Sequence, residues 1–343
     1  MQHVAIDLGS RESQVCIRTS DGTIVEEKKH PTRSLGDWMK QWPTSRVIME
    51  TSSEAFRVAD AARAAGHEVR VVRSTLAKQL GIGDRGIKTD IRDARTLSLL
   101  SCRTDVESVH IPTEETRQLR ATITSRELLV QTRTQLNNRV KSWLRTQLWR
   151  LRSGSPETLP DRVRGKAAEQ QQTLPEHIER VLLSLEALTV QVKAATQELK
   201  KLAKDSPTCR LLMTIPGIGP ISAVTFVAAI GDVSRFEYGH RLESYVGLTP
   251  GESSSSERER RTSITKAGPS SVRRTLIQAA WAVWRGYPND PMARWAMNIA
   301  ERRGRPIAIV ALARKLAGIM YAVWRTETPY QASKATRRQE LTV

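Results

Sequence analysis

The first hundred residues alternate between short apolar runs and stretches of helical periodicity. The run HVAID at 3–7 predicts a strand, and Asp21-Gly22 predicts a hairpin turn between two further strands. The Ala-rich segment that ends at Gly66 predicts a helix with a glycine after its last turn. Three strands followed by strand, helix and strand predict an α/β domain with a mixed sheet. We expect strands at 3–7, 14–18, 22–25, 46–50 and 69–72, and helices at 53–65 and 90–103.

From 113 to 205 glycine becomes rare and helix-forming residues dominate. Apolar residues from Ile178 to Leu202 recur in alternating steps of three and four, which is a heptad seam. A first helical segment carries Val140, Leu144, Leu148 and Leu151, and the Gly/Pro-containing stretch 153–160 should be a loop between the two. The pattern predicts an antiparallel coiled coil, and an ordinary helical hairpin would share it.

The remaining chain predicts a mainly helical region over 206–330 and a polar, frayed tail over 331–343. A length of 343 residues with 39% hydrophobic content fits two or three folded domains. The expected division is 1–112, 113–205 and 206–330, followed by the tail.

The chain is strongly basic, with 54 Lys and Arg against 36 Asp and Glu, a net charge of +18. That charge predicts a polyanionic partner. Three separated cysteines without zinc-ligand spacing, and an aspartate inside the apolar N-terminal run, fit a reducing cytoplasm and no secretory signal. We expect no apolar run that approaches the roughly 20 residues needed to span a bilayer. We therefore expect a cytoplasmic protein that binds nucleic acid rather than a membrane.

Four acidic residues stand out by position. Asp7 and Glu50 end apolar strands, and Asp90 and Asp93 share one face at the start of a predicted helix. If these hard oxygen donors converge at a sheet edge, they form the kind of site that holds one or two Mg²⁺ ions for phosphodiester chemistry. The alternative is four unrelated surface carboxylates. Their order and spacing resemble the RNase H/RuvC nuclease superfamily, in which strand and helix acids hold the metals.

The segment TIPGIGPISA at 214–223 resembles the hairpin of a helix-hairpin-helix motif. In that motif Gly217 and Gly219 would let backbone amides approach DNA phosphates, a contact that positions without reading sequence. A plain Pro/Gly turn between helices is the alternative.

A run of four serines, Ser253–Ser256, follows GLTPGE. By composition it is a flexible linker. A serine needs activation to become a nucleophile, and the basic residues that follow could hold a phosphate there. These basic residues do not determine which of the four serines would be the nucleophile. The basic residues of this region are Arg258, Arg260, Arg261, Lys266, Arg273 and Arg274.

The predicted helical stretch from Arg117 to Arg152 concentrates nine basic side chains against one acid, Glu127, and interleaves them with Trp143 and Trp149. Charge of one sign with aromatic residues favours nucleic-acid binding, RNA in particular, over an ordinary solvated face. The basic residues are Arg117, Arg120, Arg126, Arg133, Arg139, Lys141, Arg145, Arg150 and Arg152.

Taken in order, these signatures resemble the IS110 family of insertion-sequence transposases, with its IS1111 branch, over residues 3–330. They are AIDLGSRES (5–13), MET (49–51), KTDIRDA (88–94), IPGIG (215–219), YVGLTPGESSSSERERRTSITKAG (245–268) and VRRTL (272–276).

The resemblance implies a RuvC-like domain with a D-E-D-D metal site at Asp7, Glu50, Asp90 and Asp93, and a nucleophilic serine after GLTP. Its register allows Ser253, Ser254 or Ser255, and we assign Ser254. The implied reaction forms a covalent 5′-phosphoserine link, exchanges strands and religates them. The implied partners are target and donor DNA, a structured bridge RNA that pairs with both, and further copies of the chain in a dimer or tetramer.

Three other functions share some of these features. A RuvC-like nuclease of branched DNA would use the same acids with water as the nucleophile. A non-catalytic helix-hairpin-helix scaffold would use none of them. An actin-like ATPase resembles IDLGS in its first phosphate loop, but no second glycine-rich loop follows.

Overall fold

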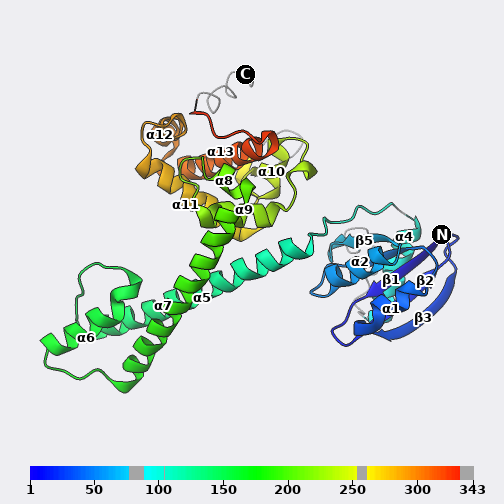
Figure 1. Ribbon diagram of the computed structural model, residues 1–343, viewed down its shortest axis with the longest axis horizontal. Helices are drawn as coiled ribbons and strands as arrows, with labels where there is room; N and C mark the ends of the chain where they lie inside the picture. The colour runs from blue at the N-terminus through cyan, green and yellow to red at the C-terminus, as the bar shows by residue number, and fades with distance from the viewer. Residues whose placement is uncertain (77–88, 104, 253–260, 333–343) are drawn as a thin grey trace. The chain divides into compact units, whose positions relative to one another are not determined.

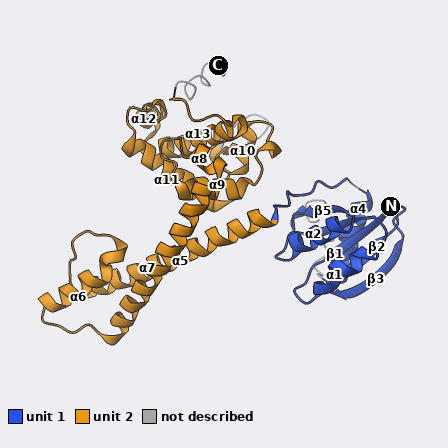
Figure 2. Ribbon diagram, viewed as in Figure 1, with its two compact units in different colours: residues 1–113 blue, residues 114–343 orange. Residues whose placement is uncertain are grey.

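The computed structural model of the chain describes residues 1–76, 89–103, 105–252 and 261–332. The chain divides into two compact units, Met1–Thr113 and Glu114–Val343, which are coloured separately in Figure 2. A mixed α/β unit is thus followed by a mostly helical one, as the hydrophobic pattern predicts.

The described part of the first unit contains a five-stranded sheet in the order β3-β2-β1-β4-β5. The β1–β2 and β2–β3 pairs are antiparallel, and the β1–β4 and β4–β5 pairs are parallel. The elements are β1 (Gln2–Asp7), β2 (Glu12–Arg18), β3 (Ile24–Pro31), η1 (Thr32–Ser34), α1 (Leu35–Lys40), β4 (Ser45–Glu50), α2 (Ala55–Ala64), β5 (Glu68–Val72) and α4 (Asp90–Arg103).

Helices cover both faces of this sheet (Figure 1). One face packs on α1 and α2 in a core that includes Ile6 and Met49. The other packs on α4, where Ala5 and Ile48 meet Leu97 and Leu100. The buried strands alternate between these two cores, which is why their sequences are almost continuously apolar.

The third strand differs from its prediction. It was expected at 22–25, whereas β3 runs from Ile24 to Pro31 through two glutamates and two lysines. Such a charged stretch has no strand pattern of its own. It pairs as the edge strand of the sheet, where charged side chains remain solvated and prevent further strand addition.

The second unit begins with two long helices and ends with a helical core (Figure 1). Its elements are α5 (Glu114–Thr146), η2 (Pro156–Thr158), α6 (Leu159–Glu169), α7 (Glu176–Asp205), α8 (Pro207–Leu212), α9 (Pro220–Ile230), η3 (Val233–Arg235), α10 (Gly239–Tyr245), β6 (Pro250–Glu252), β7 (Arg261–Ile264), α11 (Ser270–Gly286), α12 (Pro291–Arg303) and α13 (Arg305–Thr326).

Helices α5 and α7 pack against each other as a hairpin, and α6 lies at its far end. The seam residues Ile178, Leu185, Val192 and Leu199 are buried, whereas Leu202 is exposed. The first seam ends sooner than predicted, because α5 stops at Thr146 and Leu148 is 89% exposed with a φ of 57°. Coiled-coil packing of the hairpin remains a prediction.

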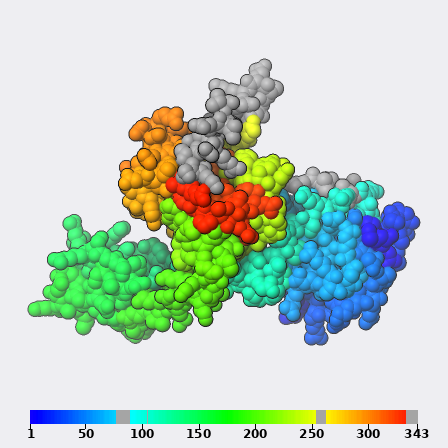
Figure 3. Space-filling view, turned by 45° about the horizontal axis from the view of Figure 1, so that its top comes forward, coloured from blue at the N-terminus to red at the C-terminus, as the bar shows by residue number. Residues whose placement is uncertain are grey.

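The two ends of the hairpin belong to different cores. Near the chain's C-terminal helices, Ile123 of α5 and Leu199 of α7 join a core that also holds Phe226 and Leu316. At the far end, Val140, Leu144, Leu159 and Ile178 form a separate cluster. Figure 3 shows the green surface of this far end standing clear of the yellow-to-red body of the unit. We call the segment from Val140 to Ile178 the hairpin tip.

One helix, α13, is long and apolar enough by length and composition to cross a membrane. Its residues Ile309, Leu312, Leu316 and Met320 are, however, buried among the other C-terminal helices. This burial is what the core helix of a soluble protein shows, and it accounts for the apolar sequence without a bilayer.

Candidate active site and nucleic-acid surface

The two strand-terminal acids lie side by side at one edge of the sheet. Strands β1 and β4 are parallel neighbours, with Ala5 opposite Ile48 and Ile6 opposite Met49. The next step of the same register brings Asp7 and Glu50, the last residues of the two strands, to the same level. Neighbouring strands are about 4.8 Å apart, so the two Cα atoms are close.

The side-chain alternation of the strands places both acids on the α4 face. Ala5 and Ile48, two residues before the acids, pack against Leu97 of α4. Side chains at i and i+2 share a face of a sheet. Asp7 and Glu50 therefore point to the side that α4 covers.

The direction of α4 brings its own acids to the same edge. His3, near the start of β1, contacts Ser101 near the end of α4, with Nδ1 2.8 Å from the hydroxyl oxygen. The helix thus runs antiparallel to β1. Asp93 is eight residues back from Ser101, about 12 Å of helix, and Asp7 is four residues on from His3, about 13 Å of strand. Asp93 is therefore level with Asp7, and Asp90 lies just beyond it.

Side-chain bonds hold α4 in this orientation. Arg95 of α4 donates to both carboxylate oxygens of Glu27 on β3, over 2.6 and 2.5 Å, and this hydrogen-bonded guanidinium lowers the pKa of Glu27. Ser98 accepts a 2.7 Å bond from Arg18 of β2. At the helix start, the Thr89 hydroxyl accepts from the amide of Arg92 over 3.3 Å. These contacts fix the end of α4 that carries Asp90 and Asp93.

The four carboxylates share this edge without forming a closed metal centre. Asp90 is exposed, and Asp7, Glu50 and Asp93 are half-buried. Within the described ranges, no group of three or more His, Cys, Asp or Glu side chains is arranged to hold a metal ion. Their chemistry still fits Mg²⁺, which takes carboxylate oxygens and keeps several of its waters.

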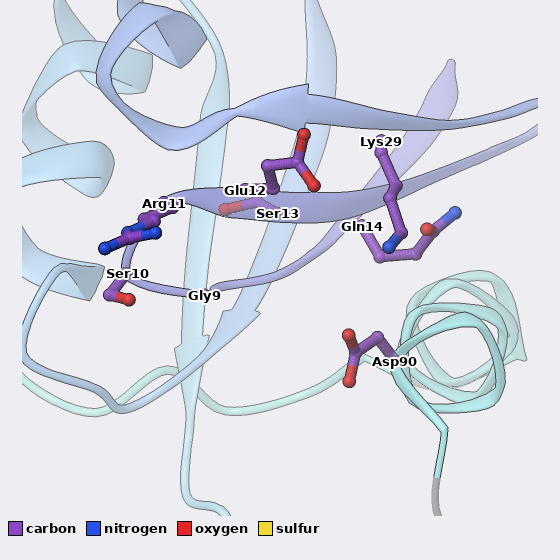
Figure 4. A pocket seen from close by; sticks show the side chains of 8 residues that line it. All are labelled: Gly9, Ser10, Arg11, Glu12, Ser13, Gln14, Lys29 and Asp90. Atoms are coloured by element: carbon purple, nitrogen blue, oxygen red, sulfur yellow. The ribbon is translucent and has the colours of Figure 1, made fainter.

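A cleft of about 610 Å³ opens between the β1–β2 turn and the start of α4, and Asp90 is the one of these four acids that lines it. Figure 4 shows the Asp90 carboxylate directed into it from the helix and Lys29 extending toward it from β3. The turn needs Gly9, because a Cβ atom there would lie 2.3 Å from the carbonyl oxygen of Glu12. The lining residues are Gly9, Ser10, Arg11, Glu12, Ser13, Gln14, Lys29 and Asp90.

Gln14 and Lys29 line this cleft although neither belongs to a sequence motif. Both lie in the transverse row of the acids, since Gln14 pairs with Asp7 and Lys29 pairs with Gln14. The signal that reveals them is cross-strand register, which requires knowing that the EEKK stretch forms a strand.

The serine run connects two paired strands, β6 and β7. Ser254, Arg258 and Arg260 lie outside the described residues, and Arg261 is the first residue of β7. The described strands were not expected in this region, which the sequence predicted as helical.

The base of this β-ribbon is held by close backbone packing. A Cβ atom on Gly247 would lie 2.0 Å from the Ala267 carbonyl oxygen, and one on Gly268 would lie 1.9 Å from that of Tyr245. Arg273 of α11 donates to the carbonyl oxygens of Ala267 and Gly268, each over 2.8 Å. These three residues therefore fix where the serine run starts and returns, which gives Arg273 a structural role besides the predicted nucleic-acid contact.

The turn between α8 and α9 contains Gly217 and Gly219, and the two differ. Gly217 has a φ of 78°, and a Cβ atom there would lie 2.6 Å from Val283 Cγ2 and 2.7 Å from the Ala279 carbonyl oxygen of α11. Packing alone therefore requires glycine at 217. Gly219 precedes α9, and a Cβ atom there would meet nothing within 4 Å. The helix-hairpin-helix interpretation stays a prediction, and Gly219 is the residue open to a ligand.

The basic residues of α5 fall into two groups. Those nearest the C-terminal core are engaged inside the protein: Arg120 donates to the carbonyl oxygens of Ala228 and Ala229, over 2.7 and 3.0 Å, and Arg126 donates to Thr196 over 2.9 Å. Burial lowers the pKa of both guanidinium groups. These two arginines fasten α5 to its neighbours, which explains their charge without a nucleic acid.

Other predicted contacts pair with acids. Arg117 bonds to Glu114, Arg133 lies 3.8 Å from Glu157, and Arg274 of α11 lies 3.7 Å from Glu127. Four of the predicted residues on α5 and the following loop are exposed, namely Arg139, Lys141, Arg145 and Arg150. Lys266, which follows β7, is exposed as well.

Three of these exposed residues, Lys141, Arg145 and Arg150, lie at the hairpin tip around a cleft of about 520 Å³. The charged side chains that line this cleft are all basic, and the aromatic side chain of Trp149 lines it as well. Arg162 shapes the wall by donating to the carbonyl oxygens of Arg152 and Ser155, over 2.6 and 3.0 Å. The lining residues are Lys141, Leu144, Arg145, Trp149, Arg150, Leu151, Arg152, Ser153, Gly154, Leu159 and Arg162.

A mixed sheet whose parallel central strands end in carboxylates, with further acids on the covering helix, is the arrangement expected of a nuclease-like domain of the DEDD class. Comparison with protein families agrees: a DEDD transposase model matches residues 4–148, and the model of the IS116/IS110/IS902 transposase family matches residues 209–294. The chain belongs to this family of insertion-sequence transposases.

Relatives match over most of the chain. A probable family 20 transposase of Pseudomonas aeruginosa is 27% identical over 96% of this chain and 99% of its own length. The transposase of insertion sequence element IS1111A from Coxiella burnetii is 30% identical over 71% of this chain and 68% of its own. A pilin gene-inverting protein of Moraxella bovis is 34% identical over 35% of this chain and 38% of its own.

Proposed function

We propose that this transposase cuts and rejoins DNA with Mg²⁺ held by Asp7, Glu50, Asp90 and Asp93 in an RNase H/RuvC-like domain. The observation that supports the proposal is the layout of the domain: β1 and β4 are parallel neighbours that end in Asp7 and Glu50, and α4 runs antiparallel to β1 and begins at the same end of the sheet. When bound, the metal would supply charge stabilisation at the attacking and leaving oxygens of a phosphodiester.

We propose that the nucleophile is a serine of the run Ser253–Ser256, with Ser254 as our assignment. Its hydroxyl oxygen would bond to phosphorus while the bond to the 3′ oxygen breaks. The hydroxyl proton leaves to a base or solvent, and the 3′ oxygen takes one up. The phosphoserine keeps the phosphodiester energy, so religation needs no ATP. The support is the paired strands that hold both ends of the run.

A bridge RNA would choose the target and donor DNA by base pairing, while the protein binds backbone and duplex shape. The hairpin tip supports such a partner, because its cleft combines basic side chains with Trp149 in a part of the unit that stands clear of the rest. Charge-reversed Lys141→Glu/Arg145→Glu protein should retain less of this RNA in a pull-down, with an unchanged thermal transition. Equal retention of the RNA by wild type and the variant would show that the hairpin tip does not bind it.

We propose that the active form contains more than one copy of the chain. On α7, Leu183 and Val190 are 55% and 62% exposed and seven residues apart, so they form an apolar stripe on one face. A second copy would cover this stripe. Light scattering of wild type and of Leu183→Gln/Val190→Gln should show a dimer or tetramer in the first and a smaller species in the second.

The proposal is tested by recombination between donor and target plasmids in cells that express the chain with the non-coding DNA flanking its gene. Asp7→Asn and Glu50→Gln should abolish recombinant junctions. Glu26→Gln is the matched control, because Glu26 lies on β3 on the opposite face and pairs with Lys28. Recombination by both acid variants at the wild-type level would contradict a catalytic role of these acids.

The nucleophile is tested by denaturing gels of the trapped reaction. Replacing the serines one at a time by alanine should remove the covalent protein–DNA adduct in one variant, Ser254→Ala in our assignment. Metal-dependent cleavage without an adduct in wild type would instead favour the RuvC-like nuclease of branched DNA.

A further inference from the structure

We propose that Lys29 binds the DNA phosphate next to the one that is cut and so sets the path of the strand across the acidic edge. This inference rests on the proposed function of that edge. It assigns a positioning role to a lysine that belongs to no recognised sequence motif.

The sheet register places both residues in line with the acids. Glu50 is level with Asp7, Asp7 pairs with Gln14, and Gln14 pairs with Lys29. One transverse row of four neighbouring strands thus carries two carboxylates, an amide and an ammonium group in that order. Paired residues of adjacent strands point to the same face, so the row presents all four side chains to one side.

Contacts of the neighbouring row confirm which side this is. Two residues before Lys29, Glu27 bonds to Arg95 of α4, and two residues after Gln14, Cys16 Sγ lies 3.2 Å from the Ser98 hydroxyl of α4. Gln14 and Lys29 therefore lie on the α4 face, and both line the cleft that Asp90 enters (Figure 4).

The adjacent lysine lies on the other face and has partners there. Lys28 Nζ is 2.7 Å from Glu26 and 5.0 Å from the centre of the Trp38 ring. Within the described residues, by contrast, no carboxylate is recorded within 4.0 Å of the Lys29 ammonium. Lys29 is exposed, so its charge is available to an anion that enters the cleft.

Distance determines which phosphate Lys29 serves. Strand β3 is two strand spacings from β1, about 10 Å. At that distance from Asp7, Lys29 is placed to contact a phosphate beside the one that the Asp7 edge would hold. Glu12 and Asp90 also line the cleft, so Lys29 offsets negative charge along the strand's path. An ammonium group suits a phosphate contact of this kind, which positions DNA without reading its sequence.

The test compares Lys29→Met with Lys28→Met in the full-length chain. The two variants remove the same charge, one residue apart, on opposite faces of β3. The probe is a fluorescein-labelled DNA duplex of mixed sequence in EDTA, where cutting does not occur, titrated by anisotropy over a series of salt concentrations. Thermal unfolding checks that both variants fold.

We expect Lys29→Met to bind roughly three- to tenfold more weakly than wild type and to lower the salt slope by about one. Lys28→Met should keep the wild-type slope, and Lys29→Arg should restore binding. A wild-type slope in Lys29→Met, or an equal loss in both lysine variants, would overturn the inference.

Failure of the proposed function would look different. It would appear as recombination by Asp7→Asn at the wild-type level, a result that the binding assay in EDTA does not depend on. In that case a lowered salt slope in Lys29→Met would still identify a DNA contact, while the same slope in wild type and variant would reject it.

Discussion

The two glycines of the α8–α9 turn offer a test that separates packing from ligand binding. Gly217 has a left-handed backbone and lies against α11, so Gly217→Ala places a methyl group 2.6 Å from Val283 Cγ2 and 2.7 Å from a backbone oxygen. Gly219 has an extended backbone, with a φ of −92°, and an open surrounding. The same substitution at both sites therefore has different physical consequences.

The cost at Gly217 has two contributions. A left-handed conformation costs a residue with a Cβ atom about 1–2 kcal/mol. Forcing one extra carbon into a packed region costs about 1–3 kcal/mol. Together they predict a loss of about 2–5 kcal/mol, or a fall in melting temperature of roughly 4–20 °C for a unit of this size. At Gly219 the loss of a favoured helix-capping glycine should cost well under about 1 kcal/mol.

Differential scanning calorimetry of the three proteins measures these shifts, and DNA binding by anisotropy is measured alongside. If the turn acts as a helix-hairpin-helix element, Gly219→Ala weakens DNA binding while its melting temperature stays close to that of wild type. A Gly217→Ala protein that melts within about 1 °C of wild type would refute the packing argument.

Two further predictions concern the serine ribbon and the first unit. Arg273→Met should destabilise the ribbon base by about 1–3 kcal/mol. It should also speed hydrogen exchange at the Thr265 amide, which bonds to the Thr249 carbonyl over 2.9 Å. The control is Arg274→Met, which loses only a 3.7 Å ion pair, and equally fast exchange in both variants would contradict this prediction. Burial, followed by the charge of Arg46, lowers the pKa of His3. The unfolded chain therefore binds a proton more readily, so stability should be complete above about pH 6.5 and decrease as the pH falls below it. His3→Asn should reduce the decrease in urea midpoint between about pH 7.5 and pH 5.5, and an unchanged decrease would show that another group is responsible.

Much of the acidic edge was predictable from local sequence. The strand that ends at Asp7 and the one that ends at Glu50 are continuous apolar runs because both faces of the sheet are covered. The helix that begins at Asp90 was also predicted with its observed bounds, since Ala94, Leu97 and Leu100 supply its apolar periodicity. Local periodicity and end signals were sufficient for these elements.

The rest depended on contacts between distant segments. Lys29 belongs to the site only because β3 extends into a charged stretch and pairs with β2, a register that no local pattern encodes. Arg120 and Arg273 have the sequence pattern of surface charges. In the structure, Arg120 donates to a carbonyl oxygen more than a hundred residues away, and Arg273 donates to a carbonyl oxygen at the base of the ribbon. The amino-acid composition gives the number of charged side chains but does not show which groups they bind.

The edge formed by Asp7, Glu50, Asp90 and Asp93 should bind a divalent metal. Electron paramagnetic resonance of free Mn²⁺, titrated with the full-length chain, measures this binding directly. We predict Mn²⁺ binding that Mg²⁺ displaces, weakened at least roughly tenfold in Asp7→Asn/Glu50→Gln, as expected when two of four oxygen donors lose their charge. Glu26→Gln should bind as wild type does. Equal Mn²⁺ affinity in wild type and the double variant would contradict the account.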